Sequence, residues 1–594
     1  MPSLRRAEAL QLGGHSNAAI REYEACLKLD GGQIKARMNL ALLYSQSGRP
    51  DKAVEHARII LSQAPLHAGA VMVLCVAARQ TQKIPELLPF LNRVIEPLLA
   101  APPSAEPAQR DRHHYAVASI CEVLERHADA ARHFLQARSM PAALSMGLRL
   151  KGKICDWTDF DRLTRELERQ AADRPQDVAP LAFIALSDDP ALHRRVAAAN
   201  AERLARIPPL PPQPQHSRPR LRVGYLSADF RAHPVAYLVA DTIAHHDRDR
   251  FEVFLYSCGP DDGSDWRRRF AGMGTLTDIR RMADQEAAQR IAQDGIDVLV
   301  DLTGLTGMNR LPILAHRPAK VAINWLGYPG TLGCGAVDYI IADRQLIPPT
   351  DERHYAEAVI RLPVTYQPSS RDRAPTGEVT AERPAAGFVL SAFNQTFKIT
   401  PGLFDIWCRL LRHRDDAILW LYATDDNARA NLRREASARG VSPDRLVFAT
   451  AAPLAVHMAR YRHVDLQLDT FPYGGHTTTS DALMMGCPVL ALRGASFPAR
   501  VAASLLSAVG LDDFVCASAA AYERKAMEVL DDPGLLADAR ARIVTNGHIL
   551  FQPERFCREL ECAYTTAMER WHAGLKPAPF DVPAQGADRA IYTR

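Results

Sequence analysis

The chain has 594 residues, which is more than a single hydrophobic core supports, so several domains are expected. Its 72 basic and 68 acidic residues nearly balance, and this gives no support to a role in nucleic-acid binding. No apolar run reaches the roughly 18 residues that span a bilayer, and the N-terminus lacks the apolar core of a signal peptide. Eleven cysteines occur without a Cys-x-x-Cys pair, which argues against a zinc site or a disulfide framework and favours a cytoplasmic location.

The first 206 residues are rich in Ala, Leu, Arg and Glu and almost free of strand patterns. Segments 14–30 and 48–65 align at a period of 34 residues, and the matched pairs are Gly14 with Gly48, Ala19 with Ala53, Ile20 with Val54, and Leu27 with Leu61. This period, with small residues at helix contacts, is typical of tetratricopeptide repeats. We therefore predict tetratricopeptide-like helices over 1–206, with two clear repeats and then degenerate pairs; an ordinary helical bundle is the alternative.

A proline-rich linker at 207–220 is followed by a change of pattern. Alternating strands and helices then indicate two successive Rossmann-like domains with parallel sheets, over 221–365 and 388–575. A polar segment at 366–387 links them, a helix at about 553–575 closes the second, and 576–594 is a tail. The predicted strands are 221–227, 251–257, 297–304, 320–327 and 339–343 in the first domain, and 388–393, 417–422, 445–450, 464–470 and 488–494 in the second.

The strand at 464–470 leads into the sequence GGHTTTSD at 474–481, which precedes a predicted helix. Thr478 and Asp481 have the spacing of a capping box, so helix capping alone would account for them. Capping does not account for the two glycines, which would let the backbone approach a ligand, or for His476 beside them. A glycine-rich loop before a helix N-terminus is a phosphate site. We predict that loop amides and the Thr477 and Thr478 hydroxyls bind a diphosphate, with Asp481 near a ribose.

Other post-strand loops carry polar candidates. Gln395 and Lys398 follow the strand at 388–393, where a lysine would neutralise a diphosphate, although a solvated surface lysine is the plainer interpretation. His457 and Arg460 are three residues apart and share a helix face. His233 follows the first strand, where it would contact a sugar, move a proton or simply bond locally. No Asp-x-Asp pair follows a strand, so we expect no metal at this site and no cofactor.

Several motifs together resemble the protein O-GlcNAc transferases, the SPINDLY-like glycosyltransferase family 41. They are LRVGYLSADFRAHP, FEVFLYSCGPDDG, RPAKVAINWLGYPGTLG, FNQTFKI and DTFPYGGHTTTSDAL, in order over roughly 220–575. The resemblance implies the GT-B arrangement of two Rossmann-like domains and metal-independent, inverting transfer of a sugar from a nucleotide diphosphate to Ser or Thr of proteins. It also implies a protein or peptide acceptor bound by the repeats.

The resemblance assigns roles residue by residue. It implies Gln395 and Lys398 at the diphosphate with Lys398 stabilising the leaving UDP, Thr477 and Thr478 at phosphate, Asp481 at the ribose, Ala452, His457 and Arg460 around the uracil, and His233, Leu326 and Gly327 near the sugar, with His233 also a proposed base. Two positions depart from the family pattern, because Leu454 stands where the animal enzymes have a lysine and Asp297 where they have a histidine. A GDP-fucose donor and a non-catalytic nucleotide-binding scaffold are the alternatives.

Overall fold

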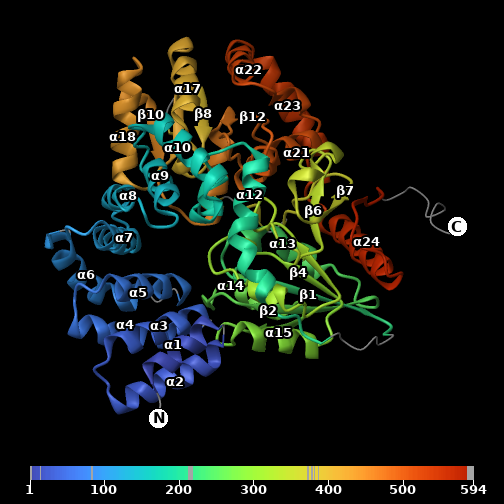
Figure 1. Ribbon diagram of the computed structural model, residues 1–594. Helices are drawn as coiled ribbons and strands as arrows, with labels where there is room; N and C mark the ends of the chain where they lie inside the picture. The colour runs from blue at the N-terminus through green and yellow to red at the C-terminus, as the bar shows by residue number, and fades with distance from the viewer. Residues whose placement is uncertain are drawn as a thin grey trace.

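The computed structural model describes residues 3–13, 15–47, 49–81, 84–102, 104–211, 218–370, 373–375, 379, 381–384 and 387–584. It contains a helical region and two sheet domains, with the helices stacked along one side of both (Figure 1). Gly14 and Gly48 of the predicted repeats lie outside the described residues, as do residues 212–217 of the proline-rich linker. Among the described residues, none of the helices is both long and apolar enough to cross a bilayer.

The N-terminal helices keep the predicted period. α2 and α4 begin 34 residues apart, at Ser16 and Pro50, and α3 and α5 begin 34 apart, at Ile34 and Ala68. The matched Ala19 and Ala53 are both fully buried between helices, as small contact residues should be. The helices are α1 (Leu4–Leu12), α2 (Ser16–Leu29), α3 (Ile34–Gln46), α4 (Pro50–Gln63), α5 (Ala68–Thr81), α6 (Ile84–Ala100), α7 (Pro107–Val123), α8 (His127–Gln136), α9 (Ala143–Lys153), α10 (Phe160–Asp173), α11 (Pro180–Phe183) and α12 (Pro190–Ala201).

The first sheet is parallel, in the order β14-β7-β6-β5-β4-β1-β2-β3. Its inner strands are almost entirely buried, which is why they read as continuous apolar runs in the sequence, whereas the edge strands β3 and β14 are more exposed. The strands are β1 (Leu221–Ser227), β2 (Phe251–Ser257), β3 (Thr275–Asp278), β4 (Val298–Asp301), β5 (Val321–Asn324), β6 (Tyr339–Asp343), β7 (Ala358–Leu362) and β14 (Phe580–Asp581). The helices between them are α13 (Pro234–Ala244), α14 (Asp265–Ala271), α15 (Asp284–Gln293) and α16 (Leu311–Ala315).

The second sheet is also parallel, in the order β10-β9-β8-β11-β12-β13. Every strand predicted in the two domains contains an observed strand, so the predicted pair of Rossmann-like sheets is confirmed. The elements are β8 (Val389–Ala392), α17 (Pro401–His413), β9 (Ile418–Tyr422), α18 (Asp426–Ala438), β10 (Leu446–Ala449), α19 (Leu454–Arg460), β11 (Leu466–Leu468), α20 (Thr477–Met484), β12 (Val489–Leu492), α21 (Val501–Ala508), β13 (Val515–Cys516), α22 (Ala519–Asp531) and α23 (Pro533–Asn546).

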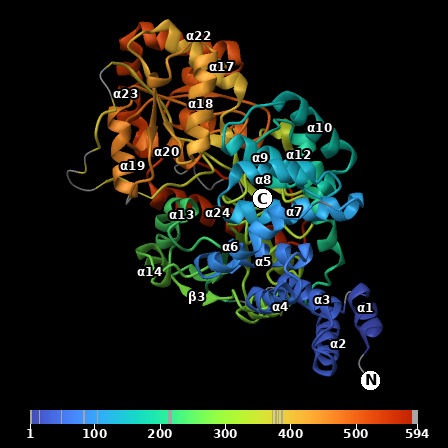
Figure 2. The same ribbon diagram turned by 90° about the vertical axis from the view of Figure 1, so that its left-hand side faces the viewer.

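The chain then returns to the first domain. α24 (Pro553–His572) packs against α13, β5 and β7, and β14 adds a strand beside β7 (Figures 1 and 2). The sequence places this helix with the second domain and the residues after it in a tail. The structure differs because the buried side chains of α24, Tyr564 among them, find their partners on the first sheet.

Candidate functional site

Both sheets reverse their strand order at a point where loops with polar side chains emerge. In the second sheet the order runs outward in both directions from β8 and β11, which are neighbours. In the first sheet the same reversal falls between β1 and β4. Ligands of parallel α/β sheets bind at such switch points, beyond the carboxyl ends of the strands. The loops after β8 and β11 carry Lys398 and the GGHTTT segment, and the loop after β1 carries His233.

Lys398 is held at the switch point by two contacts from the loop after β11. Its ammonium donates to the Gly474 carbonyl at 2.9 Å and lies 3.8 Å from the centre of the Tyr473 ring. Burial lowers the pKa of Lys398 to about 8, while the charge of Asp469 opposes the shift. This is therefore a half-buried cation beside a helix N-terminus rather than a solvated surface lysine. Gln395, three residues earlier, is exposed at the start of the same turn.

The two glycines of the GGHTTT loop are needed for a reason that the sequence did not reveal. A Cβ at Gly474 would lie 2.8 Å from the Asp469 carboxylate, and one at Gly475 would lie 2.4 Å from the Thr479 hydroxyl. They make room for the protein's own side chains, whereas the sequence analysis assigned them to close approach of a ligand. Asp469 accepts the Gly475 N–H at 2.6 Å, which fixes the loop from below.

Asp469 and Asn394 form a polar base under this loop, and the sequence analysis missed both. The Asn394 amide donates to Asp469 at 3.0 Å and to Thr470 at 2.8 Å. Burial raises the pKa of Asp469 to about 6, against the opposing bond from Gly475. The signal for Asp469 was present in the sequence, since it is an acidic residue at the carboxyl end of a strand.

The N-terminus of α20 has no side-chain cap among the described residues, so the predicted capping box is wrong. The helix begins two residues earlier than a Thr478 cap would require, with His476 at the cap position. The Thr478 hydroxyl donates instead to the Asn394 carbonyl oxygen. The Thr478 hydroxyl, predicted to bind a phosphate, is therefore bonded within the protein. The first amides of α20 are left without intrahelical partners, as at any helix N-terminus, and Thr477 beside them is half-buried.

Two buried polar atoms beside α20 have no hydrogen-bond partner among the described residues. They are Nε2 of His476 and Oε1 of Gln367. The Gln367 amide donates to the His476 carbonyl at 3.4 Å, so both side chains lie at one place. Burial lowers the pKa of His476 well below its usual value, and Lys398 adds to the shift, so the imidazole is neutral. Buried polar atoms are normally satisfied, and two unsatisfied ones together point to a bound ligand.

Asp481 lies one turn into α20 and forms a buried ion pair with Arg373. Arg373 comes from the segment between the two domains and also donates to Ser369 at 2.9 Å and Ser480 at 3.4 Å. One side of the predicted ribose contact is therefore occupied by a cation that the sequence analysis did not consider. Arg373 can orient the Asp481 carboxylate for a ribose, and the guanidinium adds positive charge to the site.

The predicted base-binding residues are brought together at the ends of β8 and β10. The His457 ring lies 5.5 Å from Phe393 and 6.1 Å from Tyr422, measured between ring centres. Burial lowers the pKa of His457 to about 4, with the charges of Arg460 and Arg373 adding to the shift. A neutral imidazole among aromatic rings suits stacking on a base. Arg460 is buried on the same helix, and Ala452 is half-buried just before α19.

His233 caps the N-terminus of α13 in the first domain. Its Nδ1 accepts the Val235 N–H at 3.3 Å and lies 3.5 Å from the Asp229 carboxylate, and its side chain is 32% exposed. Burial lowers the pKa of His233, against the charge of Asp229. Because Nδ1 accepts a hydrogen bond, the ring proton of the neutral imidazole belongs on Nε2, which is then a donor.

The loop after β5 holds Leu326 and Gly327 under backbone constraint. Leu326 has φ of +75°, a left-handed conformation that is strained for a branched side chain. A Cβ at Gly327 would lie 2.0 Å from the Leu302 carbonyl, so only glycine fits there. Strain of this kind concentrates at functional sites, and these two residues lie beside the β1–β4 switch point.

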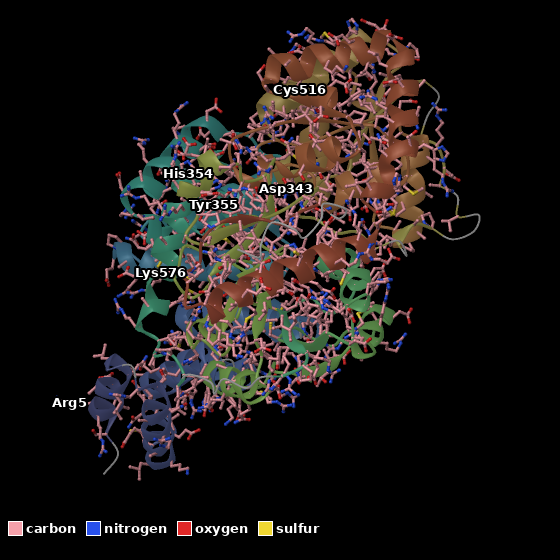
Figure 3. The ribbon with its side chains drawn as sticks, turned by 90° about the vertical axis from the view of Figure 1, so that its right-hand side faces the viewer. Arg5, Asp343, His354, Tyr355, Cys516 and Lys576 are labelled. Carbon is pink, nitrogen blue, oxygen red and sulfur yellow. The ribbon has the colours of Figure 1, made fainter. Side chains whose placement is uncertain are left out.

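The segment between the domains joins the two halves of the site. Ser370 accepts the Asp241 N–H of α13 at 3.2 Å, a few residues from the Gln367 contact with His476. Tyr473 packs against the apolar cluster that contains Tyr328 of the first domain. Asp343, at the end of β6, accepts the Ser504 hydroxyl of α21 at 2.7 Å, and Figure 3 shows it where the two sheet domains meet. The segment between the domains thus contacts both α13 and the GGHTTT loop.

Two Rossmann-like sheets meet at a shared junction, and the switch point of one of them carries a lysine beside a helix N-terminus. This is the GT-B arrangement of nucleotide-dependent transferases. An O-GlcNAc transferase from Thermobaculum terrenum, solved as a lysine-to-methionine mutant, superimposes with a TM-score of 0.68. It is 28% identical, and the match covers 92% of this chain and 99% of that one.

The sequence profile of Glycosyl transferase family 41 matches residues 154–371 and 376–560, and the chain belongs to this family. It is 30% identical over 465 residues to the probable UDP-N-acetylglucosamine–peptide N-acetylglucosaminyltransferase SEC of Arabidopsis thaliana, covering 72% of this chain and 47% of that protein. It is also 32% identical over 377 residues to the probable UDP-N-acetylglucosamine–peptide N-acetylglucosaminyltransferase SPINDLY of tomato (Solanum lycopersicum). This match covers 60% of this chain and 40% of that protein. The chain therefore spans less than half the length of these plant relatives.

Proposed function

We propose that the protein is a metal-independent, inverting O-linked N-acetylglucosaminyltransferase that uses UDP-GlcNAc and modifies Ser or Thr of proteins. The observation that carries the proposal is the half-buried Lys398 beside the N-terminus of α20, at the switch point of a GT-B pair. The printed descriptions of the relatives supply the donor and the acceptor class. Cytoplasmic placement belongs to the proposal and accords with eleven free cysteines.

In the proposed reaction the oxygen of an acceptor hydroxyl attacks C1 of the sugar from the face opposite to UDP, the bond from C1 to the β-phosphate oxygen breaks, and the hydroxyl proton is released to solvent. Negative charge then grows on the departing diphosphate. Lys398 and the first amides of α20 meet this charge, and contacts that strengthen as the charge grows lower the barrier. The neutral His457 would stack on the uracil, and Asp481, oriented by Arg373, would accept from the ribose.

His233 suits a sugar contact better than a base. With Nδ1 accepting from Val235, Nε2 carries the ring proton and donates to a sugar hydroxyl. A base would need a free lone pair on the outward-facing nitrogen, which this tautomer lacks. Leu326 and Gly327, held in a constrained loop on the same side, would complete the sugar pocket.

The donor is tested by thermal shift with UDP, GDP, UDP-GlcNAc and GDP-fucose, followed by mass spectrometry of a protein acceptor. A ligand at roughly 100 times its Kd stabilises the fold by about 2.7 kcal/mol. We expect stabilisation by the uridine nucleotides and a HexNAc increment on Ser or Thr. Stabilisation by the guanosine nucleotides with a deoxyhexose increment would favour the fucose donor. Nucleotide binding without any transfer would favour the scaffold.

Acceptor binding by the repeats is the second part of the proposal. A cavity of about 440 Å³ lies on α4 and α6, lined by charged side chains, three of them acidic, and by apolar ones: Asp51, Val54, Glu55, Arg58, Ile59, Glu86 and Leu87. Both Glu55 and Glu86 are exposed, so reversing their charge leaves the core intact. The double variant with Glu55→Lys and Glu86→Lys should reduce protein modification and leave UDP-GlcNAc hydrolysis unchanged. Glu528→Lys, on the distant α22, is the matched control, and equal rates for all three proteins would exclude this face.

A further inference from the structure

Three side chains that can bind a metal converge between α24 and the first sheet domain. They are His246, which follows α13, and Cys557 and Glu561, which are one turn apart on α24. The His246 Nδ1 lies 3.0 Å from Oε1 of Glu561 and 3.4 Å from the Cys557 sulfur, and the sulfur lies 3.8 Å from the same carboxylate oxygen. All three residues are buried.

The triangle of donor atoms fits a tetrahedral zinc ion. Zinc bonds of roughly 2.0–2.3 Å to nitrogen, oxygen and sulfur place neighbouring donor atoms about 3.3–3.6 Å apart. Of the three observed separations, 3.4 Å lies within this range and 3.0 and 3.8 Å lie just below and above it, so small side-chain shifts accommodate the ion. A mixed set of imidazole, thiolate and carboxylate is typical of zinc and unlike the all-oxygen sets of magnesium or calcium.

The surroundings also suit a metal. Nε2 of His246 bonds with the Tyr225 hydroxyl at 2.7 Å, which fixes the ring and leaves Nδ1 facing the other two ligands. The Asp247 N–H donates to Glu561 Oε1 at 2.8 Å, so the carboxylate is oriented as well. Partners of this kind orient metal ligands. One thiolate and one carboxylate neutralise a divalent ion, which a buried site requires.

We propose that His246, Cys557 and Glu561 form a zinc site that fastens α24 to the first sheet domain. The ligands lie more than 300 residues apart in the sequence, so the ion would cross-link the C-terminal helix to the sheet it covers. Its binding displaces the Cys557 thiol proton, and a water molecule takes the fourth position. α13, with 11 residues, separates His246 from His233 by about 16 Å of helix, so the ion is structural and takes no part in sugar transfer.

Metal analysis of the full-length protein tests the site. Purified without chelator and dialysed against zinc, the wild type should retain about one zinc per chain by plasma mass spectrometry. Cys557→Ser and Glu561→Gln should each lose it, whereas Cys562→Ser, on the same helix, should keep it. Wild-type protein with less than about a tenth of a zinc per chain would overturn the proposal. This outcome does not depend on any variant folding.

Thermal unfolding separates a metal site from a hydrogen-bonded cluster. With zinc, the wild type and Cys562→Ser should unfold at a higher temperature than after treatment with EDTA, while Cys557→Ser should show no difference. Equal unfolding temperatures with and without zinc in all three proteins would mean that the cluster acts by hydrogen bonds alone. Cobalt substitution adds a direct readout, because a four-coordinate thiolate site gives an intense visible spectrum that the Cys557→Ser variant must lack.

Discussion

Replacing Lys398 by Met removes the positive charge that the proposed mechanism places at the departing diphosphate, while keeping the length of the side chain. The ammonium is held by Gly474 and Tyr473 where the α20 amides begin, so no other group on this loop takes over its charge. The loss should therefore resemble that of one transition-state donor, which lowers kcat by roughly 10²–10³. His457→Ala is the comparison, because base stacking changes little during the reaction and its loss should raise KM instead.

The lowered pKa of Lys398 adds a second readout. With a pKa of about 8, the free lysine is about nine-tenths protonated at pH 7 and about one-tenth at pH 9, so kcat/KM should fall roughly tenfold at pH 9. The bound diphosphate raises this pKa, so kcat itself should hold to higher pH. Lys398→Arg keeps its positive charge over this whole pH range, so its kcat/KM should not fall at alkaline pH. Lys398→Met should be slower, and its kcat/KM should not fall at alkaline pH either.

Initial rates of UDP release, measured from pH 6 to 10 with saturating acceptor, give both parameters. The reasoning fails if Lys398→Met raises only KM while His457→Ala collapses kcat, because the diphosphate would then lie elsewhere. It also fails if the alkaline fall persists in Lys398→Met. A persistent fall would belong to the donor or to another side chain.

Three further outcomes follow from the same contacts. EDTA in the assay should leave transfer unchanged, because Lys398 and the α20 amides meet the diphosphate charge; activity that is lost and then restored by Mg²⁺ or Mn²⁺ would contradict this. Asp469→Asn should shift the alkaline fall of kcat/KM to lower pH, because the charge of Asp469 raises the pKa of Lys398. If the fall stayed at the same pH, the two charges would not be coupled. His233→Asn keeps a cap for α13 and a donor, so kcat should fall less than tenfold, whereas loss of a general base would lower it by roughly 10²–10⁴.

Ten of the fourteen strands that the structure describes could be predicted from the sequence, because burial on both faces leaves a continuous apolar run between polar loops; β3, β7, β13 and β14 were not predicted. β1, β2 and β6 coincide residue for residue with the predicted ranges. The candidate loops were also found, because ligand-binding residues of such sheets follow strands, a local signal. Lys398 and His457 needed no knowledge of distant partners.

What could not be predicted depends on contacts between distant segments. The Thr478 hydroxyl bonds Asn394, which is 84 residues away, so local capping statistics misjudged it. Arg373 lies in a polar stretch that reads as a plain linker, yet it is fully buried against Asp481. His246 and Glu561 meet only because α24 returns to the first sheet, and a search for Cys-x-x-Cys spacing cannot detect them.

The helical region contacts the second sheet domain at the loop that carries Lys398. This contact limits which deletions can test the role of the repeats. The Thr396 hydroxyl donates to the Lys153 carbonyl at 2.6 Å, and Gly152 packs so closely that a Cβ would lie 3.3 Å from the Phe397 backbone. Removing residues 1–200 would therefore disturb the loop itself and should abolish both protein modification and UDP-GlcNAc hydrolysis. Removing only 1–66, which ends before α5, should reduce protein modification while hydrolysis survives. If the short deletion abolished hydrolysis as well, the repeats would support the fold rather than select the acceptor.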